Sequence, residues 1–326
     1  MDWSIDFNID KYPFEINHND EIFMIGSCFS KNISQKLKNY KFNVFDNPYG
    51  IIYNPISIFK SLEDSLTKKN PDKKLFIKKE NIFLHYSYHS VIRGNSILDF
   101  NNKINEIQNK VKETLKRSKL LIITFGSSYT YIFKSNSTIV SNCHKQPNYL
   151  FEKSFIPSSE IINQFNNLQK KLIKINPKIK IILSVSPLRH LKDGIIENSV
   201  SKSNLIISSH YLKNSHSNIF YFPSFEIMND ELRDYRFYES DFIHPSKTAV
   251  KYIFEKFIKT LLDKNSLDII IELEKLYKDL SHSPIIEKSL TYKNFLRNSL
   301  RKAEFLKNKI DVSDEINKIK IKIKNI

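Results

Sequence analysis

Residues 120–125 form the run Leu120-Leu121-Ile122-Ile123-Thr124-Phe125, which stops at Gly126. An unbroken apolar run of this length, ended by glycine, is typical of a β-strand that is buried on both faces. Similar short runs predict further strands, and most of these runs are followed by a helical pattern. Strands that are apolar throughout and alternate with helices indicate a parallel sheet covered on both faces. The other predicted strands are residues 21–25, 42–45, 180–185 and 219–222.

The stretches between and after these strands carry the spacing of amphipathic helices, so the sequence predicts an α/β fold with right-handed crossovers. After Lys264 the pattern changes to Lys-rich amphipathic helices without strands. We therefore expect one α/β domain over residues 1–263 and a helical extension over residues 264–326. A hairpin is expected over residues 131–140 and short strands over residues 76–92. The predicted helices of the α/β part are residues 30–37, 57–66, 103–116, 158–175, 200–212 and 245–262.

The composition suits a folded globule, with 40% hydrophobic and 13% aromatic residues among 326. The formal net charge of +16 invites a nucleic-acid or anionic-membrane interpretation. Lysine is spread along the whole chain, however, and no arginine cluster is present, so we favour a solvated basic surface and expect no nucleic-acid partner. Nucleic-acid binding through the basic tail after Lys264 remains the alternative.

The start of the chain, residues 1–6, carries acids and lacks the basic, apolar pattern of a signal peptide. No apolar run approaches the roughly 18 residues that would span a bilayer. Cys28 and Cys143 lie far apart and form neither a metal-spaced pair nor a disulfide framework. We expect a cytoplasmic protein with two free thiols, no membrane span, no cofactor and no metal. His85, His89, Cys143 and His144 carry donors suited to zinc, but no two have a recognised ligand spacing.

The first predicted strand runs into Gly26-Ser27-Cys28-Phe29-Ser30, a tight turn at the start of a helix. Backbone N–H groups at a helix N-terminus lower the pKa of a thiol and stabilise an oxyanion. Cys28 or Ser27 is therefore a candidate nucleophile. The alternative is that Cys28 is a small core residue, which is the commoner role of such a cysteine.

Asp241-Phe242-Ile243-His244-Pro245 precedes the last predicted helix of the α/β part. An acid and an imidazole at this spacing meet in a turn, and Asp241 then holds His244 in the tautomer that leaves one nitrogen free as a base. Alone, the pair is equally typical of a helix cap. Because functional groups gather beyond the carboxyl ends of parallel strands, the turn at Cys28 and this pair together predict one active site.

These segments resemble the GSCFA family, whose name is the sequence of the first turn, here with Ser30 where alanine is usual. The resemblance runs through ordered blocks between about residues 20 and 258 and does not reach the tail beyond Lys264. The further blocks are residues 47–50, 53–55, 142–145, 184–190 with 193–194, 201–202, and 221–245.

The GSCFA family is in turn similar to SGNH (GDSL-type) hydrolases, which have a flavodoxin-like, three-layer α/β/α sandwich. Laying Gly26 on the glycine of their Gly-Asp-Ser block places Cys28 at the nucleophile position, with Ser27 as the neighbouring alternative. The resemblance implies an ester hydrolase or acyltransferase for a small O-acyl group on a sugar or polyol, with an acyl donor if the reaction is a transfer. His244 would be the base and Asp241 its orienting partner.

The resemblance also implies an oxyanion site framed by Gly26 and Gly50. The Gly-x-Asn-Asp block of SGNH enzymes is replaced here by Gly126-Ser127-Ser128-Tyr129, so the usual amide donor is missing. Ser128 and Asn142 are the candidate replacements. This departure leaves open a second hypothesis, a binding module for a glycan or acyl carrier that keeps the fold without the catalysis.

Arg189 and His190 follow a predicted strand at the active edge, and His144 lies in another matching block. We expect these three side chains to bind an anionic or polyhydroxylated substrate. The alternative for Arg189 and His190 is to anchor a loop through Asp193.

Overall fold

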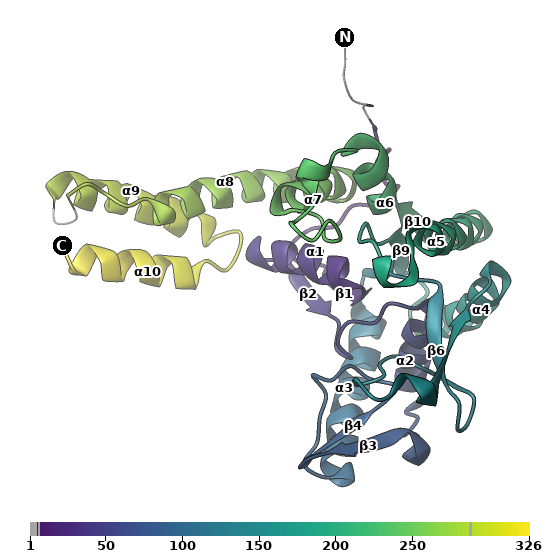
Figure 1. Ribbon diagram of the computed structural model, residues 1–326. Helices are drawn as coiled ribbons and strands as arrows, with labels where there is room; N and C mark the ends of the chain where they lie inside the picture. Colours follow the sequence, from purple (N-terminus) through teal and green to yellow (C-terminus); the bar gives the residue numbers. More distant parts are fainter. Residues whose placement is uncertain (1–4, 6, 287–288) are drawn as a thin grey trace.

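The computed structural model describes residue 5 and residues 7–286 and 289–326; most of the acidic N-terminal segment therefore lies outside the described residues. At the centre is a five-stranded, all-parallel sheet in the order β2-β1-β5-β9-β10 (Figure 1). This is the strand order of flavodoxin-like folds. The predicted α/β fold and its five core strands are confirmed: β1 (Glu21–Gly26), β2 (Asn43–Asp46), β5 (Leu120–Phe125), β9 (Lys180–Val185) and β10 (Ile219–Phe222).

Alternation along the strands builds two hydrophobic cores, because successive side chains point to opposite faces of a sheet. Phe23 and Ile25 of β1 face the core shared with α2, α3, α4 and α5. Ile22 and Met24 face the core shared with α1 and α7. The result is the predicted three-layer sandwich. The helices are α1 (Cys28–Asn39), α2 (Pro55–Thr67), α3 (Ile97–Arg117), α4 (Ser158–Ile175), α5 (Ile195–Ser215), the short α6 (Ser224–Glu226) and α7 (Lys247–Leu261), with single turns at Lys73–Leu75, Asn148–Leu150, Leu191–Asp193, Ile227–Glu231 and Tyr235–Phe237.

Two small antiparallel sheets are inserted between the core strands. The predicted hairpin over residues 131–140 is confirmed, but a third strand, β8, joins it and was not predicted. Because this sheet follows the carboxyl end of β5, its residues can form a wall beside the predicted active edge. The strands are β3 (Phe76–Lys79) paired with β4 (Ile82–His85), and β6 (Tyr129–Phe133) flanked by β7 (Thr138–Val140) and β8 (Phe151–Phe155).

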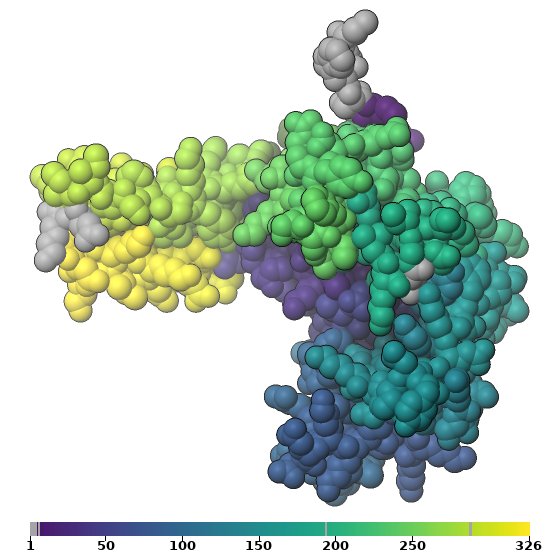
Figure 2. Space-filling model, viewed as in Figure 1, coloured from purple at the N-terminus to yellow at the C-terminus, as the bar shows by residue number. Residues whose placement is uncertain are grey.

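The predicted helical extension is confirmed as three helices, α8 (Lys264–Ser281), α9 (Leu290–Leu306) and α10 (Ser313–Lys324). They pack around a core of their own and project from the α/β body as an arm (Figures 1 and 2). The Tyr40 hydroxyl, at the end of α1, donates to Glu274 Oε1 at 2.6 Å and fixes the base of the arm. The boundary at residues 263 and 264 stays a prediction.

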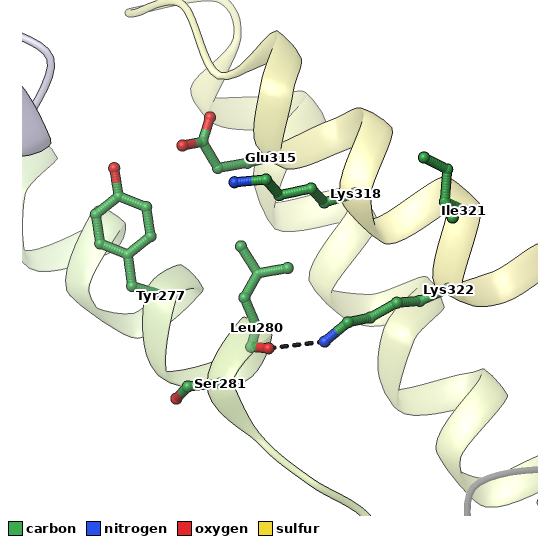
Figure 3. Close-up of a pocket in the computed structure, with 7 residues that line it drawn as sticks. All are labelled: Tyr277, Leu280, Ser281, Glu315, Lys318, Ile321 and Lys322. Atoms are coloured by element: carbon green, nitrogen blue, oxygen red, sulfur yellow. Dashed lines mark hydrogen bonds between the residues drawn. The ribbon is translucent and has the colours of Figure 1, made fainter.

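A hollow opens between α8 and α10 of this arm (Figure 3). Leu280 and Ile321 supply apolar surface, and Lys322 Nζ donates to the carbonyl oxygen of Leu280 at 2.8 Å. Within the described ranges, no helix combines the length and the apolar character that crossing a bilayer requires.

Candidate active site

A cleft of about 800 Å³ lies at the carboxyl ends of the sheet strands. Its walls come from the segments that follow β2, β5 and β9, and from the segment that precedes α7. This is the edge at which ligands bind in parallel α/β sheets. The lining includes Tyr53, Asn54, Ser127, Tyr129, Tyr131, Asn142, Cys143, His144, Lys153, Arg189, His190 and His244.

Asp241 and His244 meet in the turn before α7, as predicted. Asp241 Oδ2 lies 2.7 Å from His244 Nδ1, and Asp241 Oδ1 accepts hydrogen bonds from the backbone N–H groups of Ile243, at 2.9 Å, and His244, at 3.0 Å. The backbone bond from His244 is the largest of several influences that lower the pKa of Asp241 to about 2. The carboxylate is therefore charged at neutral pH, and it leaves Nε2 of His244 on the side of the cleft without a hydrogen bond among the described residues.

The turn after β1 depends on a glycine. Gly26 has a φ of +140°, and a Cβ built on it would lie 2.1 Å from the carbonyl oxygen of Thr124 on β5. Only glycine allows β1 and β5 to approach this closely while the chain turns into α1. The turn therefore fixes Ser27 and Cys28 at the start of the helix.

Of the two candidate nucleophiles, only Cys28 is accessible. Ser27 is 1% exposed, and its buried hydroxyl has no hydrogen-bond partner among the residues that the structure describes. Cys28 is partly exposed, and its Sγ lies 3.1 Å from the hydroxyl of Tyr53. Burial, with the hydrogen bond to Cys28 as a smaller cause, raises the pKa of Tyr53 far above that of a free tyrosine. Tyr53 is thus a neutral phenol between Cys28 and the cleft.

The structure does not pair the nucleophile with the base. In the part of the chain that is described, neither Ser27 Oγ nor Cys28 Sγ makes a hydrogen bond to His244. Tyr53 connects the two parts of the site, because it contacts Cys28 and lines the same cleft as His244. The predicted contact of Cys28 with His244 stays a prediction.

The two glycines expected at the oxyanion site have their N–H groups occupied. Gly26 donates to Asn47 Oδ1 at 2.8 Å, and Gly50 donates to the carbonyl oxygen of Asn47, also at 2.8 Å. Either group would have to leave Asn47 to bind an oxyanion. Both glycines therefore shape the loop beside the nucleophile, and their predicted role as donors stays untested.

Ser128 does not fill the role predicted for it. Its side chain is completely buried, its N–H donates to Ser201 Oγ at 2.7 Å, and its hydroxyl donates to the carbonyl oxygen of Ser201 at 3.0 Å. It fastens the loop after β5 to α5 and has no path to a substrate. Asn142 is better placed, because it lines the cleft and, among the described residues, its side chain makes one hydrogen bond, in which Oδ1 accepts from the His144 N–H at 2.7 Å.

Arg189 holds the segment that carries the acid and the base. Its Nη1 donates to the carbonyl oxygen of Phe242 at 3.2 Å, and its guanidinium carbon lies 4.0 Å from the centre of the Tyr238 ring. Phe242 lies between Asp241 and His244, so Arg189 positions the pair. The side chain of Asp193, the alternative anchor, lies outside the described part of the structure.

His190 and His144 both line the cleft but differ in their surroundings. The His190 ring stands edge-on to Tyr53 with 5.3 Å between ring centres. His144 is 6% exposed, its Nε2 lies 2.9 Å from the carbonyl oxygen of His85, and burial lowers its pKa. His144 therefore serves first to hold the strand that carries His85.

The donors considered for zinc do not assemble. His85 Nε2 lies 2.9 Å from the carbonyl oxygen of Asp72, and burial raises the pKa of Cys143 to about 11. Among the side chains that the structure describes, no three His, Cys, Asp or Glu residues are grouped as metal ligands.

Two residues at the site were not assigned a role from the sequence, although both lie in blocks that match the family. Tyr53 is the partner of Cys28. Lys202, on α5, is 1% exposed, and its Nζ donates to the carbonyl oxygens of Gly126, at 2.7 Å, and Ser186, at 2.8 Å. Burial lowers the pKa of Lys202 to about 7. In a helical pattern, a lysine is normally expected to be exposed to solvent. The only sequence signal for a role of Lys202 is therefore its position in a block that matches the family.

The family model of the GSCFA family matches residues 21–257, which contain every residue of this site. The chain belongs to the GSCFA family. A second family model, described as the C-terminal domain of GSCFA domain proteins, matches residues 273–325, within the helical arm of this GSCFA chain. No curated protein matches the sequence.

Solved structures with similar folds include three esterases and lipases. A carbohydrate esterase family 3 protein from Talaromyces cellulolyticus has a TM-score of 0.38 at 6% identity, over 78% of this GSCFA chain and 99% of its own. The lipase Lip_vut3 from a goat rumen metagenome has a TM-score of 0.39 at 11% identity, over 76% of this GSCFA chain and 99% of the lipase chain. A family two carbohydrate esterase from Clostridium thermocellum, in complex with cellohexaose, has a TM-score of 0.37 at 12% identity, over 78% of this GSCFA chain and 66% of the esterase chain.

Proposed function

We propose that this GSCFA protein is an ester hydrolase or acyltransferase that acts on a small O-acyl group of a carbohydrate or related polyol. The observation that carries the proposal is the 2.7 Å contact between Asp241 and His244 at the edge of a cleft. A charged carboxylate on Nδ1 leaves Nε2 as a base and stabilises the imidazolium that forms when Nε2 takes a proton. A partly exposed thiol at a helix N-terminus, Cys28, supplies the nucleophile.

Cys28 is preferred to Ser27 because of access and chemistry. A nucleophile has to reach the carbonyl carbon, and the Ser27 hydroxyl is buried whereas Cys28 Sγ lies at the Tyr53 hydroxyl. A thiol also needs less help from a base than a hydroxyl does. Within the described residues, no side chain caps the first turn of α1, so its backbone N–H groups are available to an oxyanion that forms at Cys28.

The reaction would proceed in two steps. Cys28 Sγ attacks the ester carbonyl as His244 Nε2 takes the thiol proton, and the tetrahedral intermediate collapses to a thioester while the alkoxide leaves with that proton. Water, or the hydroxyl of an acceptor, then attacks the thioester while His244 Nε2 takes its proton, and His244 passes that proton to the departing thiolate. Water gives a free acid, and an acceptor hydroxyl gives a new ester.

One rearrangement is needed before the first step. Cys28 Sγ has to leave the Tyr53 hydroxyl and approach His244 Nε2 when substrate binds. Catalytic hydrogen bonds often form only in the enzyme–substrate complex, so the contact seen without substrate is compatible with this step. Asn142, whose side-chain Nδ2 makes no hydrogen bond among the described residues, is the side-chain donor closest in kind to the asparagine of the SGNH block.

The lining of the cleft favours a polyol over a lipid chain. Tyr129, Tyr131 and His190 offer ring faces and polar edges, and Asn142 and Lys153 add hydrogen-bonding groups. A polyhydroxylated substrate can pair with the side-chain amide of Asn142 and the hydroxyls of Tyr129 and Tyr131, whereas an acyl chain would cover these polar groups at a cost in free energy.

The experiment that tests the proposal is a panel of acetyl and short acyl esters, on aryl, sugar and polyol alcohols, turned over by the purified chain. We expect turnover that is lost in the Cys28→Ala and His244→Ala variants and kept in Ser27→Ala. Turnover that survives His244→Ala would rule out the mechanism.

A second candidate is a binding module without catalysis. The specific observation in its favour is that Ser128 is buried and fastened to Ser201, so the SGNH amide donor has no replacement in that loop. Losing one oxyanion donor costs about 3–4 kcal/mol in a known protease. Saturable glycan binding without turnover of any ester, unchanged by Cys28→Ala, would favour this candidate.

A further inference from the structure

A second cavity, of about 620 Å³, lies next to the cleft and shares Arg189 with it. Its lining includes Phe242, which stands two residues before His244, so the second cavity is on the segment that carries the proposed base. Nothing in the mechanism above uses this cavity. Its lining residues are Arg189, Leu191, Ile195, Asn198, Ser199, Asn229, Tyr235 and Phe242.

Large apolar side chains are exposed at this cavity. Phe242 is 54% exposed, Tyr235 is 66% exposed and Ile195 is 73% exposed. Exposed apolar side chains gathered in the lining of one cavity, with polar groups beside them, mark a candidate interaction site.

The two aromatic rings are held in place. The Tyr235 and Phe242 rings lie 5.6 Å apart at 89°, and the Arg189 guanidinium carbon lies 5.5 Å from the centre of the Tyr235 ring. Arg189 also binds the backbone carbonyl of Phe242. The rings therefore form a pre-arranged aromatic platform, which a ligand need not order when it binds.

The backbone at Phe242 supports a functional role. Phe242 has a φ of +56°, in the left-handed region that a bulky residue rarely adopts. With 54% of its surface exposed, Phe242 gains only partial burial there to offset the strain. Strain of this kind clusters at ligand and active sites.

Two asparagines supply hydrogen-bonding groups beside the aromatic rings. Asn198 is 8% exposed, and its Oδ1 accepts from the His190 N–H at 2.8 Å, while its Nδ2 makes no hydrogen bond in the described part of the chain. Asn229 uses its Nδ2 on the carbonyl oxygen of Phe225, at 2.8 Å, which leaves its Oδ1 as an acceptor. The cavity thus presents one amide donor and one amide acceptor beside the rings.

We propose that this second cavity is a saccharide subsite, in which the apolar face of a sugar ring stacks on one of the two perpendicular rings, Tyr235 or Phe242, and its side contacts the other, while its hydroxyls pair with Asn198 and Asn229. A pyranose has an apolar C–H face and a polar edge, which matches this division of the lining. A fatty acyl chain would cover the rings but leave the buried Asn198 amide without a partner. The inference rests on the proposed function, because it assigns the sugar portion of the same substrate.

The test is calorimetric titration of the full chain with unesterified hexasaccharides built from glucose, xylose, mannose and N-acetylglucosamine, and separately with octanoate. We expect at least one hexasaccharide to bind, with the dissociation constant raised about tenfold in Tyr235→Ala and in Phe242→Ala. Phe305→Ala, which removes a phenylalanine of the helical arm that is 63% exposed, is the matched control and should leave binding unchanged. Phe242→Trp keeps an aromatic face and should retain binding, which separates loss of the platform from misfolding.

The outcomes separate this subsite from the catalytic proposal. Hexasaccharide binding that depends on Phe242 supports the subsite even if no ester is turned over, and the same titration with His244→Ala should give the same result. Ester turnover without hexasaccharide binding overturns the subsite and leaves the catalysis standing. Binding that is indifferent to both aromatic residues, or octanoate binding in place of sugar binding, also overturns it.

Discussion

The buried side chain of Lys202 donates to the carbonyl oxygen of Gly126 at 2.7 Å, and so joins α5 to the loop that follows β5. A second bond, to the carbonyl oxygen of Ser186, joins the loop that follows β9. The segments after both strands line the cleft. One amine therefore fixes the spacing of two walls of the proposed active site.

Lys202→Met should destabilise the fold, because it leaves two buried carbonyl oxygens without donors. We expect a loss of about 1–3 kcal/mol in the free energy of unfolding, since relief of the buried charge offsets part of the cost. Urea unfolding of both proteins at pH 7 measures this difference in the free energy of unfolding. Lys213→Met, at an exposed position of the same helix, is the matched control and should stay within about 0.5 kcal/mol of wild type.

Lys202 should also make stability depend on pH. Its pKa is lowered to about 7 in the folded chain, from 10.5, so between these values the unfolded chain binds one proton more. Stability should therefore rise with pH from about 7 toward 10, with a slope of up to about 1.4 kcal/mol per unit from this group. The slope should be smaller in Lys202→Met. If the free energy of unfolding changes with pH in the same way in wild type and in Lys202→Met, Lys202 does not have the lowered pKa.

Asp241→Asn should reduce turnover strongly without unfolding the chain. The amide cannot stabilise the imidazolium of His244, and the same change in a serine protease lowers kcat by about 10,000-fold. Because hydrogen bonds hold the pKa of Asp241 at about 2, its carboxylate is charged above about pH 4, and its support is lost only as the pH falls through about 2. Any loss of activity between pH 5 and 8 must come from another group, which a pH–rate profile checks.

The two thiols should react at different rates. Burial raises the pKa of Cys143 to about 11, so at pH 8 only about 0.1% of it is thiolate. Iodoacetamide should therefore label Cys28 first, and labelling of Cys143 should rise about tenfold per pH unit up to pH 10. Peptide mapping of wild type and Cys28→Ser follows both sites; faster labelling of Cys143 at pH 8 would be inconsistent with the burial described.

Gly26→Ala should prevent the native turn. Its Cβ would lie 2.1 Å from the Thr124 oxygen, and both atoms belong to strands that cannot separate without breaking the sheet. We expect a loss of about 3 kcal/mol or more, or no folded protein. Ser27→Ala, one residue along, removes a buried hydroxyl that has no partner in the described part of the chain, and it should be neutral or stabilising; thermal unfolding of both variants measures the two effects.

Much of the fold could be predicted because the sheet is parallel. Strands such as β5 are buried on both faces and read as continuous apolar runs, and helices such as α4 carry a regular amphipathic spacing. β8 was missed because it lies in a small surface sheet and holds Glu152 and Lys153, which break any apolar pattern. The order of the strands came only from the family resemblance, since local pattern does not specify which strands are neighbours.

The site was predictable only where its geometry is local. Asp241 and His244 are three residues apart, so their contact follows from one turn. Ser128 could not be judged, because its burial depends on α5, which arrives some seventy residues later through Ser201. For the same reason the sequence did not reveal that Tyr53 lies at the sulfur of Cys28.

The most direct test of the catalytic account is to trap the acyl-enzyme with an activated acyl ester and map the adduct by mass spectrometry. The account predicts a single acyl group on Cys28 that accumulates in wild type and forms much more slowly in His244→Ala, while Ser27→Ala behaves as wild type. An adduct on Ser27, or acylation of Cys28 at an unchanged rate without His244, would contradict it.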